Sequence, residues 1–258
     1  MSEPTSQQSL KILVAEDEPV NRVLMSKMLK HLGYQADYVG NGAEALSASN
    51  QKDYEIILMD IQMPEMDGFS ATREILKSRP KETKPVIIAV TALAKDGIRD
   101  QCAQAGMSDY LRKPVDAEML RQVLDKWKQP ASSATGSSEM TDTNPDKALH
   151  ERLDVLQHET DPSFVKELLD MFLASTPSQL EKIRQAIERS DGKVLHAGAH
   201  GLKGGSSNIG AARLASLCQK LENAGETGQF EDVNRLFDEL NREFESLRNE
   251  LRKYAAQL

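Results

Sequence analysis

The chain has 258 residues and a formal net charge of −8, with 39% apolar and 28% charged residues. This composition is typical of globular domains, and the length suffices for about two of them. The acidic balance excludes nucleic acid as an expected partner, because binding to phosphates needs a cationic surface. No run approaches the about 18 apolar residues that a membrane span requires, so no membrane insertion is expected.

Residues 1–9 are polar and lack the apolar core of a signal peptide, which predicts an N-terminal tail. Residues 10–128 then alternate short apolar runs with amphipathic stretches. Strands are predicted at 10–15, 35–39, 55–60, 86–90 and 109–113, and helices near 19–31, 42–50, 67–78, 95–105 and 116–127. Strand–helix repeats of this length favour an α/β domain with a five-stranded parallel sheet and helices on both faces.

Residues 129–145 read QPASSATGSSEMTDTNP, a run of small, polar and helix-breaking residues. Such a composition is typical of a flexible linker, with an ordered surface loop as the alternative. The change in composition therefore predicts a second domain from residue 146 onward.

Residues 146–258 show no convincing strand pattern, and their apolar residues recur at helical spacing. Helix breaks are expected near Pro162, Pro177, Asp191-Gly192, Gly210 and residues 225–228. The pattern predicts a short helix at 146–158 followed by four main helices, packed as an all-α antiparallel four-helix bundle.

Reactive side chains lie where four of the predicted strands end. They are Glu16-Asp17 after the first strand, Asp60 at the third, Thr91 at the fourth and Lys113 at the fifth. Ligand sites of open parallel sheets form beyond the carboxyl ends of the strands, so these side chains should meet. Three carboxylates held together repel one another unless a cation lies among them, and oxygen ligands suit Mg²⁺. One carboxylate could then attack a phosphoryl donor and form an aspartyl phosphate.

These residues resemble the receiver domain of two-component response regulators. The resemblance covers residues 10–128. The motifs that carry it are Glu16-Asp17, MDIQMPEMDG at 59–68, VTALA at 90–94 and YLRKP at 110–114. It implies a flavodoxin-like, doubly wound sheet.

The resemblance also implies a role for each position. Asp60 is the phosphoacceptor, Lys113 pairs with the phosphate, and Thr91 and Tyr110 move together as a switch. Pro114 follows a cis peptide bond. The implied ligands of Mg²⁺ are Asp17, Glu16 through a water molecule, Asp60 and the backbone carbonyl of Gln62.

Simpler structural roles remain as alternatives for these residues. Glu16-Asp17 and Thr91 could cap helices, since helix N-termini favour acids and hydroxyls. Tyr110 could be a packing residue, Lys113 a solvated charge and Asp60 a turn residue.

In the second half, the segment GKVLHAGAHGLKGGSSNIGAARL at 192–214 carries two histidines on one helix. On a helical wheel, Leu195, Ala199, Leu202 and Ser206 form the packed stripe. His196, His200 and Lys203 lie on a different arc, so we expect His200 to face outward. A neutral imidazole nitrogen is a competent nucleophile for phosphorus, and Lys203 supplies a cation for the phosphoryl group. Gly204 leaves room for a partner.

This segment resembles a histidine-containing phosphotransfer (HPt) domain through AHGLKGGSSNIGA at 199–211. The resemblance implies a four-helix bundle with His200, not His196, as the phosphoacceptor. A solvated helix histidine is the simpler alternative for His200. We assign no role to His31, His150 and His158, and no metal to the i, i+4 histidine pair, because no third ligand is visible.

The sequence thus predicts a phosphorelay protein that passes phosphate between an upstream histidine kinase and a downstream response-regulator receiver. Exchange between Asp60 and His200 of the same chain is a further expectation, since tethering raises the effective concentration. Three alternatives stay open. They are a C-terminal fragment of a hybrid sensor kinase, a phosphorylation-gated binding module without onward transfer, and a metal-dependent phosphatase. Cys102 and Cys218 form no CxxC pair, which favours a cytoplasmic protein.

Overall fold

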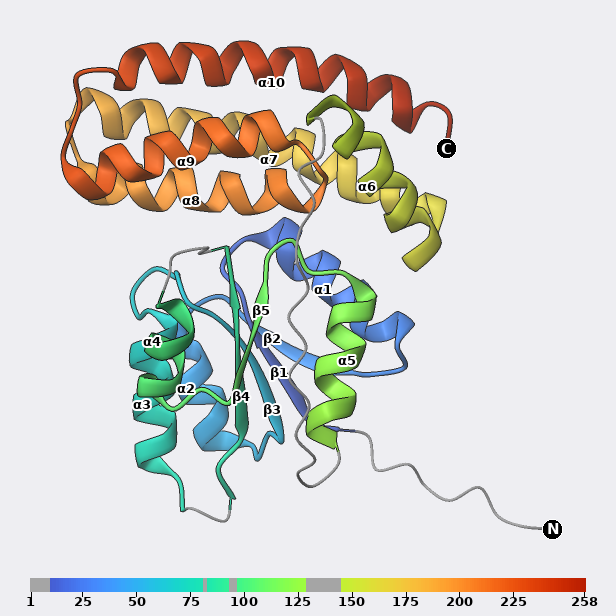
Figure 1. Ribbon diagram of the computed structural model, residues 1–258, viewed down its shortest axis with the longest axis vertical. Helices are drawn as coiled ribbons and strands as arrows, with labels where there is room; N and C mark the ends of the chain where they lie inside the picture. Colours follow the sequence, from blue (N-terminus) through green and yellow to red (C-terminus); the bar gives the residue numbers. More distant parts are fainter. Residues whose placement is uncertain (1–9, 81–82, 93–96, 129–144) are drawn as a thin grey trace. The chain divides into compact units, whose positions relative to one another are not determined.

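The computed structural model describes residues 10–80, 83–92, 97–128 and 145–258 (Figure 1). It divides into two compact units, one holding the sheet and the other the helices from residue 145 onward. The predicted tail at 1–9 and all but the last residue of the predicted linker lie outside the described residues.

The first unit is built on one parallel sheet. Its strands are β1 (Ile12–Ala15), β2 (Ala36–Val39), β3 (Ile56–Asp60), β4 (Val86–Thr91) and β5 (Asp109–Arg112). They lie in the order β2-β1-β3-β4-β5, and every neighbouring pair is parallel. The order reverses between β1 and β3, which is where doubly wound sheets open a crevice at their carboxyl ends. The predicted five-stranded α/β fold is confirmed.

Helices cover both faces of this sheet. They are α1 (Pro19–His31), α2 (Gly42–Gln51), α3 (Gly68–Ser78), α4 (Ile98–Ala105) and α5 (Ala117–Lys128). Figure 1 shows α2, α3 and α4 on one face and α1 and α5 on the other. Burial on both sides explains why β3 reads as a continuous apolar run in the sequence, since all its residues are buried.

One core cluster illustrates how the sheet is held. Leu13, Ile57 and Ile87 from adjacent strands pack with Ala71 and Ile75 of α3, and none of them is exposed. Each fully buried aliphatic side chain contributes about 1.5–3 kcal/mol. Alternate strand residues point to this face, and the position of Asp60 at the end of β3 is therefore fixed by the packing of the residues before it.

The second unit is helical. Its elements are α6 (Pro145–Glu159), α7 (Pro162–Glu188), α8 (Gly192–Asn208), α9 (Ala212–Thr227) and α10 (Val233–Ala255). The last four contact one another in a closed ring, α7 with α8, α8 with α9, α9 with α10 and α10 with α7, while α6 packs on α7 and α9. The predicted four-helix bundle with a leading helix is thus confirmed.

The expected helix break near Pro177 is wrong, because α7 runs through this residue without interruption. Proline removes one backbone hydrogen bond and costs about 3 kcal/mol inside a helix. Tertiary packing offsets this cost, since Phe172, Leu180 and Ile183 on both sides of the proline are buried. The hydroxyl of Thr176 also donates to the carbonyl oxygen of Phe172 at 2.7 Å.

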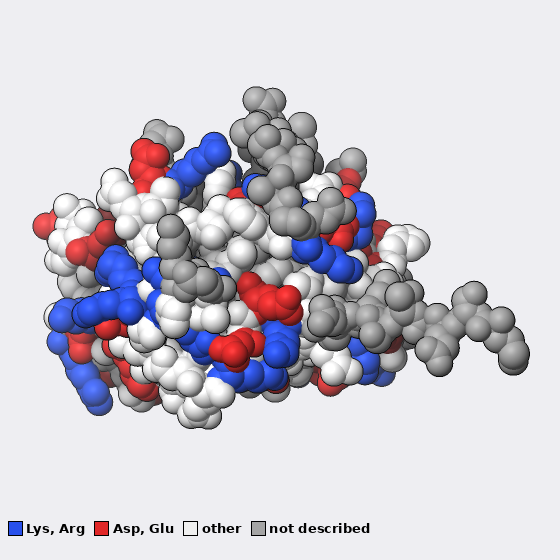
Figure 2. All heavy atoms as spheres, turned by 90° about the horizontal axis from the view of Figure 1, so that it is seen from below, with Lys and Arg blue, Asp and Glu red and all other residues white. Residues whose placement is uncertain are grey.

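The character of the helices and the charge of the surface concern the partners of the protein. None of the helices in the described part of the chain has both the length and the apolar character needed to cross a bilayer. On the face drawn in Figure 2, basic and acidic side chains lie next to one another. Mixed charge of this kind favours solvation.

Candidate functional site

An acid cluster forms at the carboxyl edge of the sheet. Carboxylate oxygens of Glu16, Asp17 and Asp60 all lie within 4.8 Å of one another. Glu16 and Asp60 are only 3% and 2% exposed, so water screens their repulsion poorly. A hard divalent cation with oxygen ligands is the group that would balance these charges. The three acids that the sequence singled out are therefore brought together.

Local structure places Asp60 at this edge. The backbone N–H of Gln62 donates to Oδ1 of Asp60 at 3.0 Å and holds the carboxylate at the end of β3. The chain then folds back, and the N–H of Gly68 donates to the carbonyl oxygen of Ile61 at 2.8 Å. A Cβ at Gly68 would lie 2.1 Å from the Asp60 carbonyl oxygen, so only glycine fits there. Asp67 caps α3 by accepting from the N–H of Ser70.

The neighbouring strands bring the other predicted residues to the same edge. Thr91 ends β4 and is buried, and Lys113 follows β5 and is 8% exposed. The peptide bond between Lys113 and Pro114 is cis, as the resemblance implied. Tyr110 is half exposed on β5, and its backbone N–H donates to the carboxylate of Asp109 at 2.9 Å. The switch role of Thr91 and Tyr110 stays a prediction.

The expectation that His200 faces outward stays a prediction, and within the helical unit its ring lies against α9. Its Nδ1 lies 2.9 Å from Oε1 of Glu222 on the neighbouring helix α9. Lys203 is also buried and pairs with Oε2 of the same carboxylate. A helical wheel describes one helix alone, so it separates the two arcs of α8 correctly but omits the contact with α9.

Glu222 is the functional candidate that sequence reasoning missed. It is 2% exposed. Burial raises its pKa, but the interactions with His200 and Lys203 outweigh that effect and lower the pKa to about 2. The signal was present, because Glu222 lies four residues after the buried Cys218 and so falls within the apolar stripe of α9.

This carboxylate determines which nitrogen of a neutral His200 ring carries the proton. An ionised carboxylate only accepts hydrogen bonds, so Nδ1 carries the proton. The lone pair of the neutral ring is then on Nε2. Lys203 also donates to Oε1 of Gln219 at 3.0 Å, so α9 supplies two acceptors for its ammonium group.

The glycines of α8 have more than one role. Gly198 lies against Ile183, and Gly205 against Phe172, so both let α8 pack on α7. The proposed role of Gly204 in making room for a partner stays a prediction. Within the described ranges, His196 and His200 do not belong to any group of three or more side chains that could hold a metal ion.

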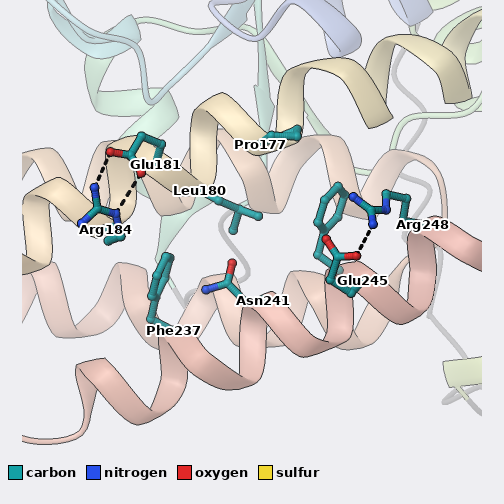
Figure 3. A pocket seen from close by; sticks show the side chains of 9 residues that line it. Pro177, Leu180, Glu181, Arg184, Phe237, Asn241, Glu245 and Arg248 are labelled. Carbon is teal, nitrogen blue, oxygen red and sulfur yellow. Dashed lines mark hydrogen bonds and ion pairs between the residues drawn. The ribbon is translucent and has the colours of Figure 1, made fainter.

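A groove in the helical unit lies apart from His200. It has a volume of about 290 Å³ and lies between α7 and α10 (Figure 3). Leu180 and Phe237 form part of its lining, with ion pairs of Arg184 with Glu181 and of Arg248 with Glu245 at its rim. It contains neither of the predicted phosphoacceptors.

Comparison with protein families assigns both units. Residues 12–125 match the family described as the response regulator receiver domain. Residues 167–250 match the Hpt domain.

Similar proteins carry the same pair of regions. The sensor protein GacS of Pseudomonas syringae pv. syringae is 31% identical over 227 residues, covering 85% of this chain. The signal transduction histidine-protein kinase BarA of Escherichia coli K12 is 29% identical over 231 residues, covering 88% of this chain. The chain spans about a quarter of the length of these curated relatives, 25% in both cases.

A solved structure of the receiver domain of sensor histidine kinase PA1611 from Pseudomonas aeruginosa PAO1 is 41% identical, with a TM-score of 0.43. It covers 46% of this chain and 97% of that one, and it has a magnesium ion coordinated in its active-site cleft.

The chain therefore contains a response regulator receiver domain followed by an Hpt domain. This pair of domains defines a phosphorelay signalling protein of the two-component class.

Proposed function

We propose that Asp60 accepts a phosphoryl group in a Mg²⁺-dependent reaction and that His200 exchanges a phosphoryl group with a receiver aspartate. The observation that carries the proposal is the acid cluster, in which three carboxylates at strand ends lie within 4.8 Å of one another. The ion would be held by Glu16, Asp17, Asp60 and the backbone carbonyl of Gln62. When bound, Mg²⁺ supplies positive charge to the phosphoryl oxygens.

Different residues of the receiver domain carry out different parts of the proposed phosphoryl transfer. A carboxylate oxygen of Asp60 attacks phosphorus, the new P–O bond forms, and the P–N bond to the donor histidine breaks. The ammonium of Lys113 neutralises a phosphoryl oxygen, and the hydroxyl of Thr91 donates to another. Tyr110 would then turn with Thr91, which passes the change to the surface of β5.

The Hpt domain supplies a nucleophile. Nε2 of His200 attacks the phosphorus of an aspartyl phosphate, the P–O bond breaks, and the carboxylate leaves as an anion. Glu222 keeps the proton on Nδ1 throughout, and its negative charge stabilises the positive charge that the phosphorylated ring acquires. Lys203 offsets the charge of Glu222 and lies one turn from the reacting ring.

The proposed partners follow from this chemistry. The donor to Asp60 is the phosphohistidine of a histidine kinase, a class to which the relative BarA belongs by name. The partner of His200 is an aspartate of a receiver domain, either Asp60 of the same chain or a residue of a separate response regulator. We also propose a cytoplasmic location, because Cys102 and Cys218 are free and buried, as suits a reducing compartment.

The test is phosphorylation by a small acyl phosphate with Mg²⁺, mapped by residue in the wild type, Asp60→Asn and His200→Gln. We expect base-labile label at Asp60 that needs Mg²⁺ and disappears in Asp60→Asn. Acid-labile label at His200 that requires Asp60 would demonstrate internal exchange. Label at Asp60 alone would indicate that His200 serves a separate receiver, to be tested with added receivers. Absence of label at both residues would overturn the proposal and favour a binding module.

A further inference from the structure

Three side chains of α8 converge on one residue of α9. His196, His200 and Lys203 are spaced i, i+4 and i+7, which places them on one helix face. Nδ1 of His196 lies 3.2 Å from the backbone carbonyl oxygen of Glu222, and Nδ1 of His200 lies 2.9 Å from Oε1 of its side chain. Lys203 pairs with Oε2. The backbone and both carboxylate oxygens of Glu222 therefore all face α8.

The contact with the backbone fixes the orientation of His196. A carbonyl oxygen only accepts hydrogen bonds, so Nδ1 of His196 must carry a proton. Its Nε2 then lies 3.9 Å from Oε1 of Glu222, and its ring stacks on that of His200 with an interplanar angle of 11°. His196 thus contacts Glu222 through the backbone carbonyl, and this contact does not depend on the charge of the ring.

The helix backbones are unusually close at the same level. A Cβ at Gly225 would lie 2.7 Å from the backbone nitrogen of His196 and 2.6 Å from the carbonyl oxygen of Gly192. A Cβ at Gly192 would lie 2.6 Å from the carbonyl oxygen of Gly225. The two glycines allow this approach, and Gly225 is one helical turn after Glu222. The close approach of the two backbones therefore brings His196 and Glu222 to the same level of the bundle.

We propose that His196 is a positioning residue that acts through Glu222 to hold His200 in the tautomer with its proton on Nδ1. The bond from His196 to the backbone of Glu222 fixes the position from which the carboxylate reaches Nδ1 of His200. Nε2 of His200 then keeps the lone pair that attacks phosphorus. This inference rests on the proposed role of His200 as phosphoacceptor.

The tautomer of His200 is the direct readout. Nitrogen-15 NMR of the imidazole side chains in the full chain distinguishes a proton on Nδ1 from a proton on Nε2, and it needs no phosphate. We expect one tautomer of His200 in the wild type and a mixture in His196→Ala. The His196→Asn variant should restore the wild-type tautomer, because its amide N–H takes the place of Nδ1–H.

Phosphotransfer provides the second readout. We expect His196→Ala to slow the appearance of label at His200 about five- to tenfold, the size of one lost hydrogen bond, and His196→Asn to recover most of the rate. The matched control is His158→Ala, an exposed histidine on α6 to which no role is assigned. Labelling of Asp60 should be unchanged in all three variants.

Two results would overturn the inference. One is an unchanged tautomer and rate in His196→Ala. The other is a folded His196→Asn variant with the same altered tautomer and rate as His196→Ala. If His196→Ala loses its helical circular dichroism, the His196→Asn variant alone tests the inference, by comparison with the wild type. Failure of the proposed function gives a different result. The histidine label would then remain in His200→Gln, while the tautomer of His200 in the His196 variants would still change as expected.

Discussion

The two phosphoacceptor candidates differ in how their charge is balanced. Asp60 lies with two further carboxylates, and the proposed function places a divalent cation among them. Beside His200, Glu222 and Lys203 form an ion pair whose two charges balance each other. Under the proposed function the receiver domain takes up a metal ion for its reaction, whereas the Hpt domain uses charges of its own side chains.

Under the proposed function, this difference indicates where catalysis lies. Stabilising the charge of a transferring phosphoryl group requires cations at its oxygens, and Lys113 and a bound metal ion would supply them in the receiver domain. The Hpt domain would orient a nucleophile and fix its tautomer, which lowers no barrier at phosphorus by itself. Four experiments test this division.

The largest expected effect is at the metal position. Asp17→Asn, or removal of Mg²⁺ by a chelator, should slow the labelling of Asp60 on the order of 10²- to 10³-fold, because the carboxylates lose their balancing cation. A time course with a small acyl phosphate measures this effect. Asp53→Asn is the matched control, since this aspartate is exposed and lies outside the cluster. An equal rate in Asp17→Asn would contradict the metal assignment.

The second effect concerns stability. Glu222→Ala leaves the buried ammonium of Lys203 without its carboxylate and should destabilise the Hpt domain by about 3 kcal/mol or more. Urea unfolding followed by far-UV circular dichroism measures it. Trp127 is the single tryptophan of the chain and lies in α5, so its fluorescence reports separately on the receiver domain.

The double variant Glu222→Ala/Lys203→Ala should recover part of this loss, because no charge is then left unpaired. A loss below about 1 kcal/mol in Glu222→Ala would show that the Glu222–Lys203 pair contributes little.

The third effect is a pH dependence. The folded pKa of Glu222 is lowered from 4.5 to about 2 by His200 and Lys203, against the opposing effect of burial. A lowered folded pKa adds stability that is complete above the unfolded pKa and is lost as the pH falls through the folded value. The urea midpoint of the Hpt domain should therefore fall between pH 4.5 and about 2, and more steeply in the wild type than in Glu222→Gln. Equal slopes of the urea midpoint against pH in the wild type and Glu222→Gln would contradict the lowered pKa of Glu222.

The smallest effect is expected on the surface. Arg184→Ala removes ion pairs to Glu181 and Glu188 that lie at the groove between α7 and α10. Exposed ion pairs of this kind are screened by water and salt, so neither the melting temperature nor the labelling of His200 should change measurably. A clear loss of transfer would instead give the groove a role in the relay.

Several features could be predicted from the sequence alone. The alternation of apolar runs predicts the parallel sheet, because strands buried on both faces leave a continuous hydrophobic pattern. The order of strands also predicts that Glu16, Asp17 and Asp60 meet, since the carboxyl ends of parallel strands lie at one edge. Within α8, the helical period separates the packed residues from the arc of His196, His200 and Lys203.

Tertiary structure alone decided the surroundings of His200. Glu222 is 22 residues away on another helix, and the sequence contains no rule that relates the register of α9 to that of α8. That register depends on side-chain packing and on the close approach at Gly192 and Gly225. The same holds for Pro177, where contacts with the rest of the bundle keep α7 continuous against the local preference of proline. Periodicity fixes which face a residue takes on its own helix, but only packing decides what covers that face.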